Sequence, residues 1–189
     1  MMKLLTTVVG ALLVLSIGLY ADFNKTLILE GITFHISAVR SDMGESKVVV
    51  KPDGLAIDNR KMEVSVEGSV VGAEVADINH DGSPELYIFI VSDGSGSYGS
   101  LVAFSTNRKK SLSDIYLPPL LEDKINNKGY MGHDSFHIEE GRLVRRFPVY
   151  QEGDPNCCPS GGERRLEYRL VAGEAGWKLE LIKSETVKK

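Results

Sequence analysis

The chain has 189 residues, of which 42% are hydrophobic and 25% are charged, and its formal net charge at pH 7 is −4. This length supports a single domain with its own hydrophobic core. The basic residues occur in short runs of two or three, which argues against a nucleic-acid-binding protein. A mildly acidic surface suits a cationic partner, which it attracts over a long range.

The N-terminal region has the pattern of a secretory signal peptide. Lys3 is followed by an apolar stretch from Leu4 to Leu19, and the small residue Ala21 provides a cleavage point. We therefore predict that residues 1–21 are removed and that residues 22–189 form one periplasmic domain. An uncleaved anchor helix is the alternative, but the stretch is shorter than the roughly 20 apolar residues of a membrane span. No cysteine lies near the cleavage point, so we expect no membrane contact after cleavage.

Short segments with strand patterns follow along the chain. Leu27–Leu29, Ile32–Ile36 and Lys47–Val50 are candidate strands, and Met62–Glu67, Leu166–Leu170 and Trp177–Leu181 alternate apolar and polar residues. Leu86–Val91 is apolar throughout, which predicts a central strand covered on both faces. A short helix is expected at most once, around Leu120–Lys124. The sequence predicts an all-β fold, a single-domain antiparallel β-sandwich.

A nine-residue motif before the central strand carries oxygen ligands at regular spacing. Asp77, Asn79 and Asp81 occupy alternate positions, Gly82 stands sixth and Glu85 ninth, as in the first half of a calcium loop. The Glu usual at the twelfth position is missing. Calcium is therefore one candidate ligand, and a turn braced by side chains without a metal is the favoured interpretation.

A glycine-rich loop, Asp93–Ser100, follows the central strand and precedes the apolar run Leu101–Phe104. It is longer than a hairpin needs. Glycine lets a backbone approach a partner closely, and an aromatic ring such as that of Tyr98 supplies contact area at a small entropic cost. We predict a recognition loop, and a flexible hairpin tip is the alternative.

Cys157 and Cys158 are adjacent in the sequence. Neighbouring Cα atoms lie about 3.8 Å apart, below the usual disulfide range. Free thiols and bridges to a second subunit are the alternatives to a vicinal disulfide, which an oxidising compartment favours. No Cys or His pair has the spacing of a zinc site.

Signatures of catalysis are sparse. His133 and Asp134 are adjacent and could form a base with its carboxylate partner, which would suit a small hydrolase. Ser95 lacks the Gly-x-Ser-x-Gly surroundings of a nucleophile. We therefore predict that the protein is not an enzyme. A calcium-dependent secreted binding or adhesion module is the alternative function.

Four segments in order carry a family resemblance: Gly72–Asp77, Ser95–Leu101, Gly129–Asp134 and Arg145–Tyr150. Together they resemble the periplasmic inhibitors of invertebrate-type (i-type) lysozyme, or PliI family. The resemblance extends over residues 27–182 and implies a β-sandwich without cofactor or catalysis, a homodimer, and i-type lysozyme as the partner. Within the last segment, Arg145 and Arg146 could form a binding patch, but because they precede Phe147 and Pro148 they are interpreted as bracing a strand edge.

The resemblance also implies a binding site. A Ser-Gly-x-Tyr loop would enter the lysozyme cleft, with a basic residue after the second strand of the hairpin as a further contact. The residues in question are Ser95, Gly96, Ser97, Tyr98, Arg108 and Lys110. A lysozyme cleft carries two carboxyl groups, which hydroxyl groups and a cation could bind. A solvated turn is the alternative for the basic stretch.

Overall fold

The computed structural model describes residues 23–188, which form twelve strands. The strands are β1 (Phe23–Leu29), β2 (Ile32–Arg40), β3 (Glu45–Asp53), β4 (Met62–Glu67), β5 (Ser69–Ala76), β6 (Glu85–Val91), β7 (Gly99–Ser105), β8 (Ser113–Tyr116), β9 (Ser135–Glu139), β10 (Arg142–Pro148), β11 (Glu163–Ala172) and β12 (Trp177–Val187). A single 3₁₀ turn, Leu120–Glu122, stands where a short helix was expected. The predicted signal peptide, residues 1–21, lies outside the described residues.

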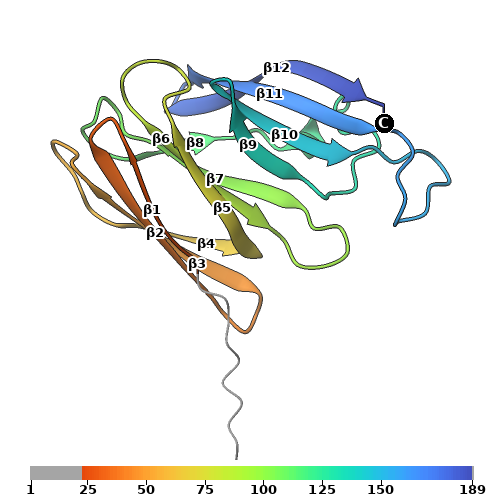
Figure 1. Cartoon of the computed structure of the whole chain (residues 1–189), viewed down its shortest axis with the longest axis horizontal. Helices are drawn as coiled ribbons and strands as arrows, with labels where there is room; N and C mark the ends of the chain where they lie inside the picture. The colour runs from red at the N-terminus through yellow and green to blue at the C-terminus, as the bar shows by residue number, and fades with distance from the viewer. Residues whose placement is uncertain (1–22, 189) are drawn as a thin grey trace, which may run out of the picture.

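The strands form two sheets that pack together (Figure 1). A four-stranded antiparallel sheet has the order β1-β2-β3-β4, and an eight-stranded sheet has the order β5-β6-β7-β8-β12-β11-β10-β9. Neighbouring strands run antiparallel except β8 and β12, which are parallel. The predicted all-β class is therefore confirmed, and one sheet is mixed rather than purely antiparallel.

The alternating segments of the sequence are strands with one buried face. In β11, Leu166, Tyr168 and Leu170 are buried, whereas Arg169 is exposed. The alternating segments 62–67 and 177–181 lie in β4 and β12. Side chains of a strand point alternately to opposite faces, so apolar residues at every second position can reach one core.

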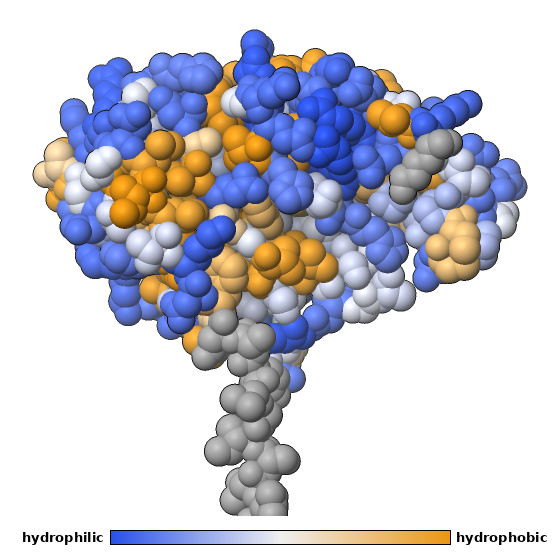
Figure 2. Space-filling model, viewed as in Figure 1, coloured by the Kyte–Doolittle hydropathy of each residue, from blue (hydrophilic) through white to orange (hydrophobic). Residues whose placement is uncertain are grey.

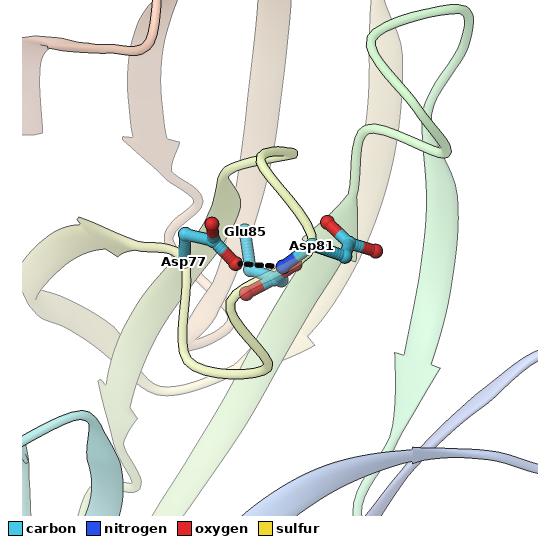
Figure 3. Close-up of side chains that lie close together, drawn as sticks. All are labelled: Asp77, Asp81 and Glu85. Atoms are coloured by element: carbon cyan, nitrogen blue, oxygen red, sulfur yellow. Dashed lines mark hydrogen bonds between the residues drawn. The ribbon is translucent and has the colours of Figure 1, made fainter.

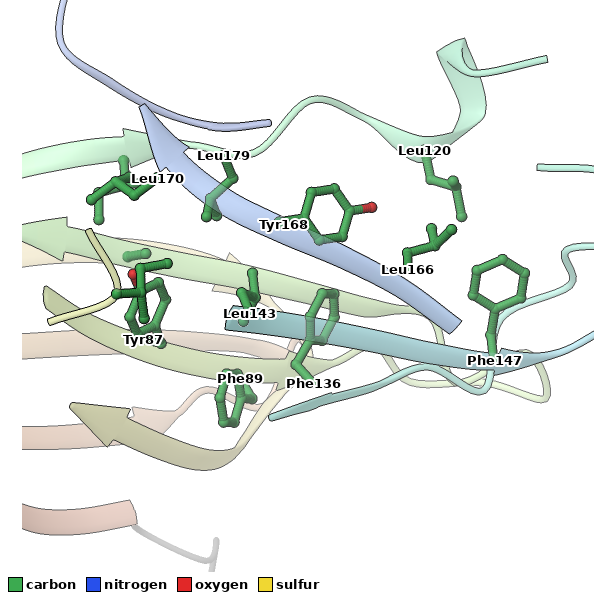
Figure 4. Close-up of a cluster of buried hydrophobic side chains, with 13 residues drawn as sticks. Tyr87, Phe89, Leu120, Phe136, Leu143, Phe147, Leu166, Tyr168, Leu170 and Leu179 are labelled. Carbon is green, nitrogen blue, oxygen red and sulfur yellow. The ribbon is translucent and has the colours of Figure 1, made fainter. Parts of the chain in front are cut away.

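Strand β6 is buried on both faces and separates two hydrophobic clusters, as its sequence predicted. Leu86 and Ile88 pack toward the four-stranded sheet, in a cluster that includes Phe34 and Ile36 of β2. Tyr87 and Phe89 point the other way, into a cluster enclosed by the eight-stranded sheet (Figure 4). The second cluster also holds Phe136, Leu143, Phe147, Leu166 and Leu179. Each large apolar side chain buried in this way contributes about 1.5–3 kcal/mol.

The eight-stranded sheet curls until its two edge strands, β5 and β9, come close to each other. The Glu74 carboxylate on β5 bridges them, because it accepts a hydrogen bond from the Ile138 N–H of β9 at 2.8 Å. His137 Nδ1 lies 3.3 Å from the same carboxylate. The sheet is therefore nearly a barrel, and the loop between β6 and β7 lies at one of its ends.

Candidate functional site

The loop of residues 92–98 joins β6 to β7 and projects from the molecule (Figure 1). Two hydrogen bonds close its base: the Ser92 N–H donates to the Tyr98 carbonyl at 2.9 Å, and the Tyr98 N–H donates to Ser92 Oγ at 3.0 Å. At the tip, the Ser97 N–H donates to the Gly94 carbonyl at 3.3 Å. The loop therefore has a defined turn rather than a frayed end.

A second loop, residues 129–134, supports the tip from one side. The His133 N–H donates to the Gly96 carbonyl at 2.7 Å. Gly132 has a φ of +91°, and a Cβ atom on it would lie only 2.0 Å from the Gly96 oxygen. Only glycine fits this position without displacing the tip. The fold thus joins two of the four sequence segments that carried the family resemblance.

A buried carboxylate anchors the start of β7. The Asp134 side chain is fully buried and accepts hydrogen bonds from the Gly99 N–H at 2.8 Å and the Tyr130 hydroxyl at 2.7 Å. Arg145 Nε donates to its other oxygen at 2.5 Å. Burial alone would lower the pKa of Arg145, but the charge and hydrogen bond of Asp134 and the nearby Tyr130 and Tyr168 together outweigh it, so the pKa lies above its ordinary value.

Arg145 belongs to the interior, which corrects the interpretation that it braces a strand edge. It is 5% exposed. Its guanidinium lies over the rings of Tyr130 and Phe136, with centroid distances of 5.1 and 5.2 Å, and it donates to the Tyr130 hydroxyl at 2.8 Å. Its neighbour Arg146 instead pairs with Glu139 near the surface. Arg145 therefore supports the 92–98 loop indirectly: it holds Asp134, which accepts the hydrogen bond from Gly99 at the end of the loop.

The side chains at the tip face outward. Tyr98 is 48% exposed and packs edge-to-face on Tyr130 at a centroid distance of 5.7 Å. Ser95 is exposed. Within residues 23–188, the loop's hydrogen bonds involve its backbone, the hydroxyls of Ser92 and Ser97 and the carboxylate of Asp93, which leaves the hydroxyls of Ser95 and Tyr98 available to a partner.

The basic residues Arg108 and Lys110 lie beyond the opposite end of β7. The strand has seven residues, which separate its ends by about 20 Å. The Lys110 carbonyl accepts hydrogen bonds from the Ile57 and Asp58 N–H groups at 3.1 and 2.9 Å. The structure therefore groups Ser95, Gly96, Ser97 and Tyr98, and it does not bring the two basic residues to them.

The basic residue that contacts the loop is Arg40, at the end of β2. It forms an ion pair with Asp93 and donates a hydrogen bond to Ser69 Oγ. Sequence reasoning missed Arg40 because it lies 53 positions before Asp93. Only the packing of the two sheets brings them together, and no local pattern signals it.

The adjacent His133 and Asp134 do not form a base–carboxylate pair in the described part of the chain. Asp134 is engaged by Arg145, Tyr130 and Gly99. The His133 side chain is exposed, and its backbone has a φ of +59°. A left-handed residue directs its side chain away from the regular strand direction, so sequence adjacency gives no contact here.

The predicted oxygen ligands come together at the turn between β5 and β6. One carboxylate oxygen each of Asp77, Asp81 and Glu85 lies within 4.8 Å of the other two (Figure 3). Burial raises the pKa of the Glu85 carboxyl to about 8; the hydrogen bond from Ile78 opposes this shift, and the charges of Asp77 and Asp81 add to it. The site is rich in acceptors and short of positive charge.

The sulfur atoms of Cys157 and Cys158 are joined in the structure. They lie on an exposed loop that Asp154 organises, because its carboxylate accepts hydrogen bonds from the Gln151 and Ser160 N–H groups, both at 2.7 Å. A vicinal disulfide inside one loop links no distant elements, so its role is confined to that loop.

The surface of the described residues carries apolar patches (Figure 2) and a groove next to the 92–98 loop. On the face shown in Figure 2, apolar residues reach the surface in several separate patches among hydrophilic ones. Beside the 92–98 loop runs a groove lined by Tyr98, Leu101, Leu117, Pro118 and Tyr130. The most defined surface feature is therefore a projecting, braced loop with a groove beside it, as expected of a small all-β protein that binds another macromolecule through a loop.

A comparison with protein families identifies that class more closely. The family described as periplasmic lysozyme inhibitor of I-type lysozyme (PliI) matches residues 59–121, about a third of the chain. This match confirms the family resemblance over these residues, which contain the segments Gly72–Asp77 and Ser95–Leu101, and thus both the 92–98 loop and the acidic turn. Searches of curated proteins and of solved structures gave no significant match. No helix among residues 23–188 is long and apolar enough to cross a membrane.

Proposed function

We propose that the protein is a periplasmic inhibitor of i-type lysozyme and that it acts by inserting the 92–98 loop into the enzyme's active-site cleft. The observation that carries this proposal is the combination of a braced loop backbone and exposed side chains at the tip. Hydrogen bonds that involve Ser92 and His133 hold the loop backbone, and Asp134 accepts one from the Gly99 N–H directly after the loop. The side chains of Ser95 and Tyr98, in contrast, are exposed. The family match over the loop supports the choice of partner.

A braced loop binds at a lower entropic cost than a flexible one. Ordering a side chain or loop on binding costs about 0.5–1.5 kcal/mol for each immobilised side chain. Tyr98 already rests against Tyr130, and the Gly96 carbonyl is already bonded to the second loop. Much of this cost is therefore met when the inhibitor folds, before it meets the enzyme.

The chemistry of the tip suits a cleft with two carboxyl groups. The hydroxyls of Ser95 and Tyr98 can donate hydrogen bonds to them, and the Tyr98 ring can occupy a sugar subsite. The only acidic residue of the loop, Asp93, is paired with Arg40, so its charge is offset before it approaches the cleft. The loop contains no glycosidic bond, and the enzyme therefore has nothing to cleave.

The proposal also covers catalysis, export and oligomeric state. The matched family consists of inhibitors, and we propose no catalytic activity for this chain. We also propose that the signal peptide is cleaved and that two copies form a homodimer. The mass of the exported protein tests the first point, and sedimentation equilibrium tests the second.

A cell-wall lysis assay tests the function. Purified mature protein is titrated against i-type, chicken-type and goose-type lysozymes, and we expect saturable inhibition of the i-type enzyme. If none of the three is inhibited, the proposed function is wrong.

Two substitutions test the mechanism. Tyr98→Ala should weaken inhibition about 30-fold, equivalent to about 2 kcal/mol, if the ring is an anchor. Ser95→Ala removes one hydrogen bond and should weaken inhibition about fivefold. Ile28→Ala, at a residue of β1 that is 67% exposed, is the control and should inhibit like the parent. Full inhibition by both loop variants would refute the loop mechanism while leaving the inhibitory function in place.

A further inference from the structure

The turn between β5 and β6 takes no part in the proposed inhibition. It ends at Glu85, the first residue of β6, whereas the 92–98 loop begins after Val91, the last residue of that strand. The two features therefore lie at opposite ends of β6 (Figure 1). The turn nevertheless gathers three carboxylates, Asp77, Asp81 and Glu85, and this arrangement needs its own explanation.

The distances between these carboxylates suit one shared cation. Calcium binds oxygen ligands at about 2.3–2.6 Å, so two oxygens on the same ion lie no more than about 5 Å apart. One oxygen from each of the three side chains lies within 4.8 Å of the others. The spacing therefore allows a single calcium ion to contact all three side chains.

The buried Glu85 is the observation that points to a ligand. Its side chain is 0% exposed, and it lies between Asp77 and Asp81 in Figure 3. Oε2 accepts a hydrogen bond from the Ile78 N–H at 3.0 Å, but Oε1 is buried and has no hydrogen-bond partner. A buried oxygen left without a partner is costly, and a cation at this position would supply the missing interaction.

No positive side chain of the described residues fills that role. Within residues 23–188, none of the three carboxylates forms an ion pair with Lys, Arg or His. The buried Asp134, by contrast, is matched by Arg145 at 2.5 Å. The same fold thus pairs one buried acid with a cationic side chain and leaves another without one.

The turn is already shaped for binding. The two oxygens of Asp77 accept hydrogen bonds from the Asp81 N–H at 3.1 Å and the Gly82 N–H at 2.8 Å. Gly82, at the sixth position, has a φ of +78°, the sharp turn that this position of a calcium loop requires. Asn79 Oδ1 faces the same backbone and lies 3.2 Å from the Asp81 nitrogen.

We propose that the turn from Asp77 to Glu85 is a calcium-binding site, in which the carboxylates of Asp77, Asp81 and Glu85 and the amide oxygen of Asn79 hold the ion. The remaining ligands are backbone oxygens or water, because calcium takes six to eight oxygens. Calcium fits better than magnesium, which demands a near-ideal octahedron and keeps several waters. The ion fastens the turn onto the start of β6, so its effect is on stability.

Calorimetric titration tests the proposal with CaCl₂ as the probe and EDTA-treated mature protein in the cell. We expect saturable binding of one ion per chain. At a calcium concentration about 100 times the dissociation constant, the thermal midpoint should rise by about 5–10 °C. Magnesium at the same concentration should raise it less. Absence of saturable binding up to about 10 mM CaCl₂, roughly tenfold above the dissociation constant of the weakest extracellular calcium sites, would overturn the proposal.

Matched variants separate a site from a general effect of the ion. Asp81→Asn changes an exposed residue and preserves an acceptor for the Ser83 N–H, so it should fold and bind calcium at least tenfold more weakly. Glu85→Gln should do the same. Asp154→Asn alters a turn that is also braced by an Asp but does not belong to the cluster of three carboxylates, and it should bind like the parent. Unchanged affinity in Asp81→Asn would refute the assignment. Calcium should leave lysozyme inhibition at 25 °C unchanged, so the test is independent of the proposed function.

Discussion

Replacing Gly132 by alanine tests whether the second loop positions the inhibitory tip. The new Cβ would lie 2.0 Å from the Gly96 oxygen and 3.3 Å from the Tyr98 ring. An ordinary contact begins at 3.4 Å, so the new Cβ and the Gly96 oxygen must move apart by about a further 1.4 Å. The Gly96 carbonyl is part of the tip itself, so the tip has to move.

The cost of this change has two parts. An alanine held at a positive φ costs about 1 kcal/mol. Moving the tip also stretches the 2.7 Å hydrogen bond between the His133 N–H and the Gly96 carbonyl beyond its normal length of about 3.2 Å, which costs about 1 kcal/mol more. We therefore expect Gly132→Ala to lower the free energy of unfolding by about 2 kcal/mol. Inhibition should weaken at least about tenfold, because a misplaced anchor loses its contacts.

Gly31 provides the matched control. It has a φ of +80° in the turn between β1 and β2, and a Cβ there would meet no atom within 4 Å. Gly31→Ala should therefore cost about 1 kcal/mol of stability and inhibit like the parent. Urea unfolding measures the first quantity and the lysis assay the second. If the two variants inhibit i-type lysozyme equally, the support of the tip by the second loop is not needed, and the reasoning is refuted.

Three further outcomes follow from the contacts described above. Asp134→Ala should lower the free energy of unfolding by about 3–5 kcal/mol, measured in urea, because it leaves the buried Arg145 without its counter-ion; a loss below 1 kcal/mol would contradict this role. Hydrogen bonds from two arginines lower the pKa of Glu139 to about 2 from 4.5, so its contribution to stability is present above pH 4.5 and is lost as the pH falls toward 2. Glu139→Gln should reduce the change in the free energy of unfolding between pH 4.5 and 2 by no more than about 1 kcal/mol, since Glu139 and its arginine partners are near the surface. An unchanged pH dependence would show that another acid dominates. For Cys157 and Cys158, mass spectrometry after alkylation should find no labelled thiol before reduction and two after it, and labelling before reduction would exclude the disulfide.

The strands could be predicted where one residue pattern decides burial. Alternation in 62–67 and 166–170 predicted strands with one buried face, and the apolar run 86–91 predicted a strand buried on both. These patterns work because side chains alternate along a strand and water sorts them by polarity. The tip residues Ser95 and Tyr98 could likewise be selected from their local sequence.

The support of the loop could not be predicted in this way. Arg40 reaches Asp93 only because two sheets pack together, and Arg145 reaches Asp134 only because β10 forms part of the core. Both contacts depend on tertiary structure rather than on a local pattern. Lys110 is far from the tip for the converse reason. It is close to the loop in sequence, but the seven-residue strand β7 separates the two in space.

The placement of β12 has a consequence for how the protein is made. This strand, Trp177–Val187, lies between β8 and β11 in the interior of the larger sheet, although it is the last strand in the sequence. Until it arrives, β8 and β11 each present an unpaired edge that can pair with another chain. A chain whose last residues are not yet available therefore cannot complete the larger sheet, and a chaperone that shields these edges during folding should raise the yield of folded protein more than one that acts on the finished fold.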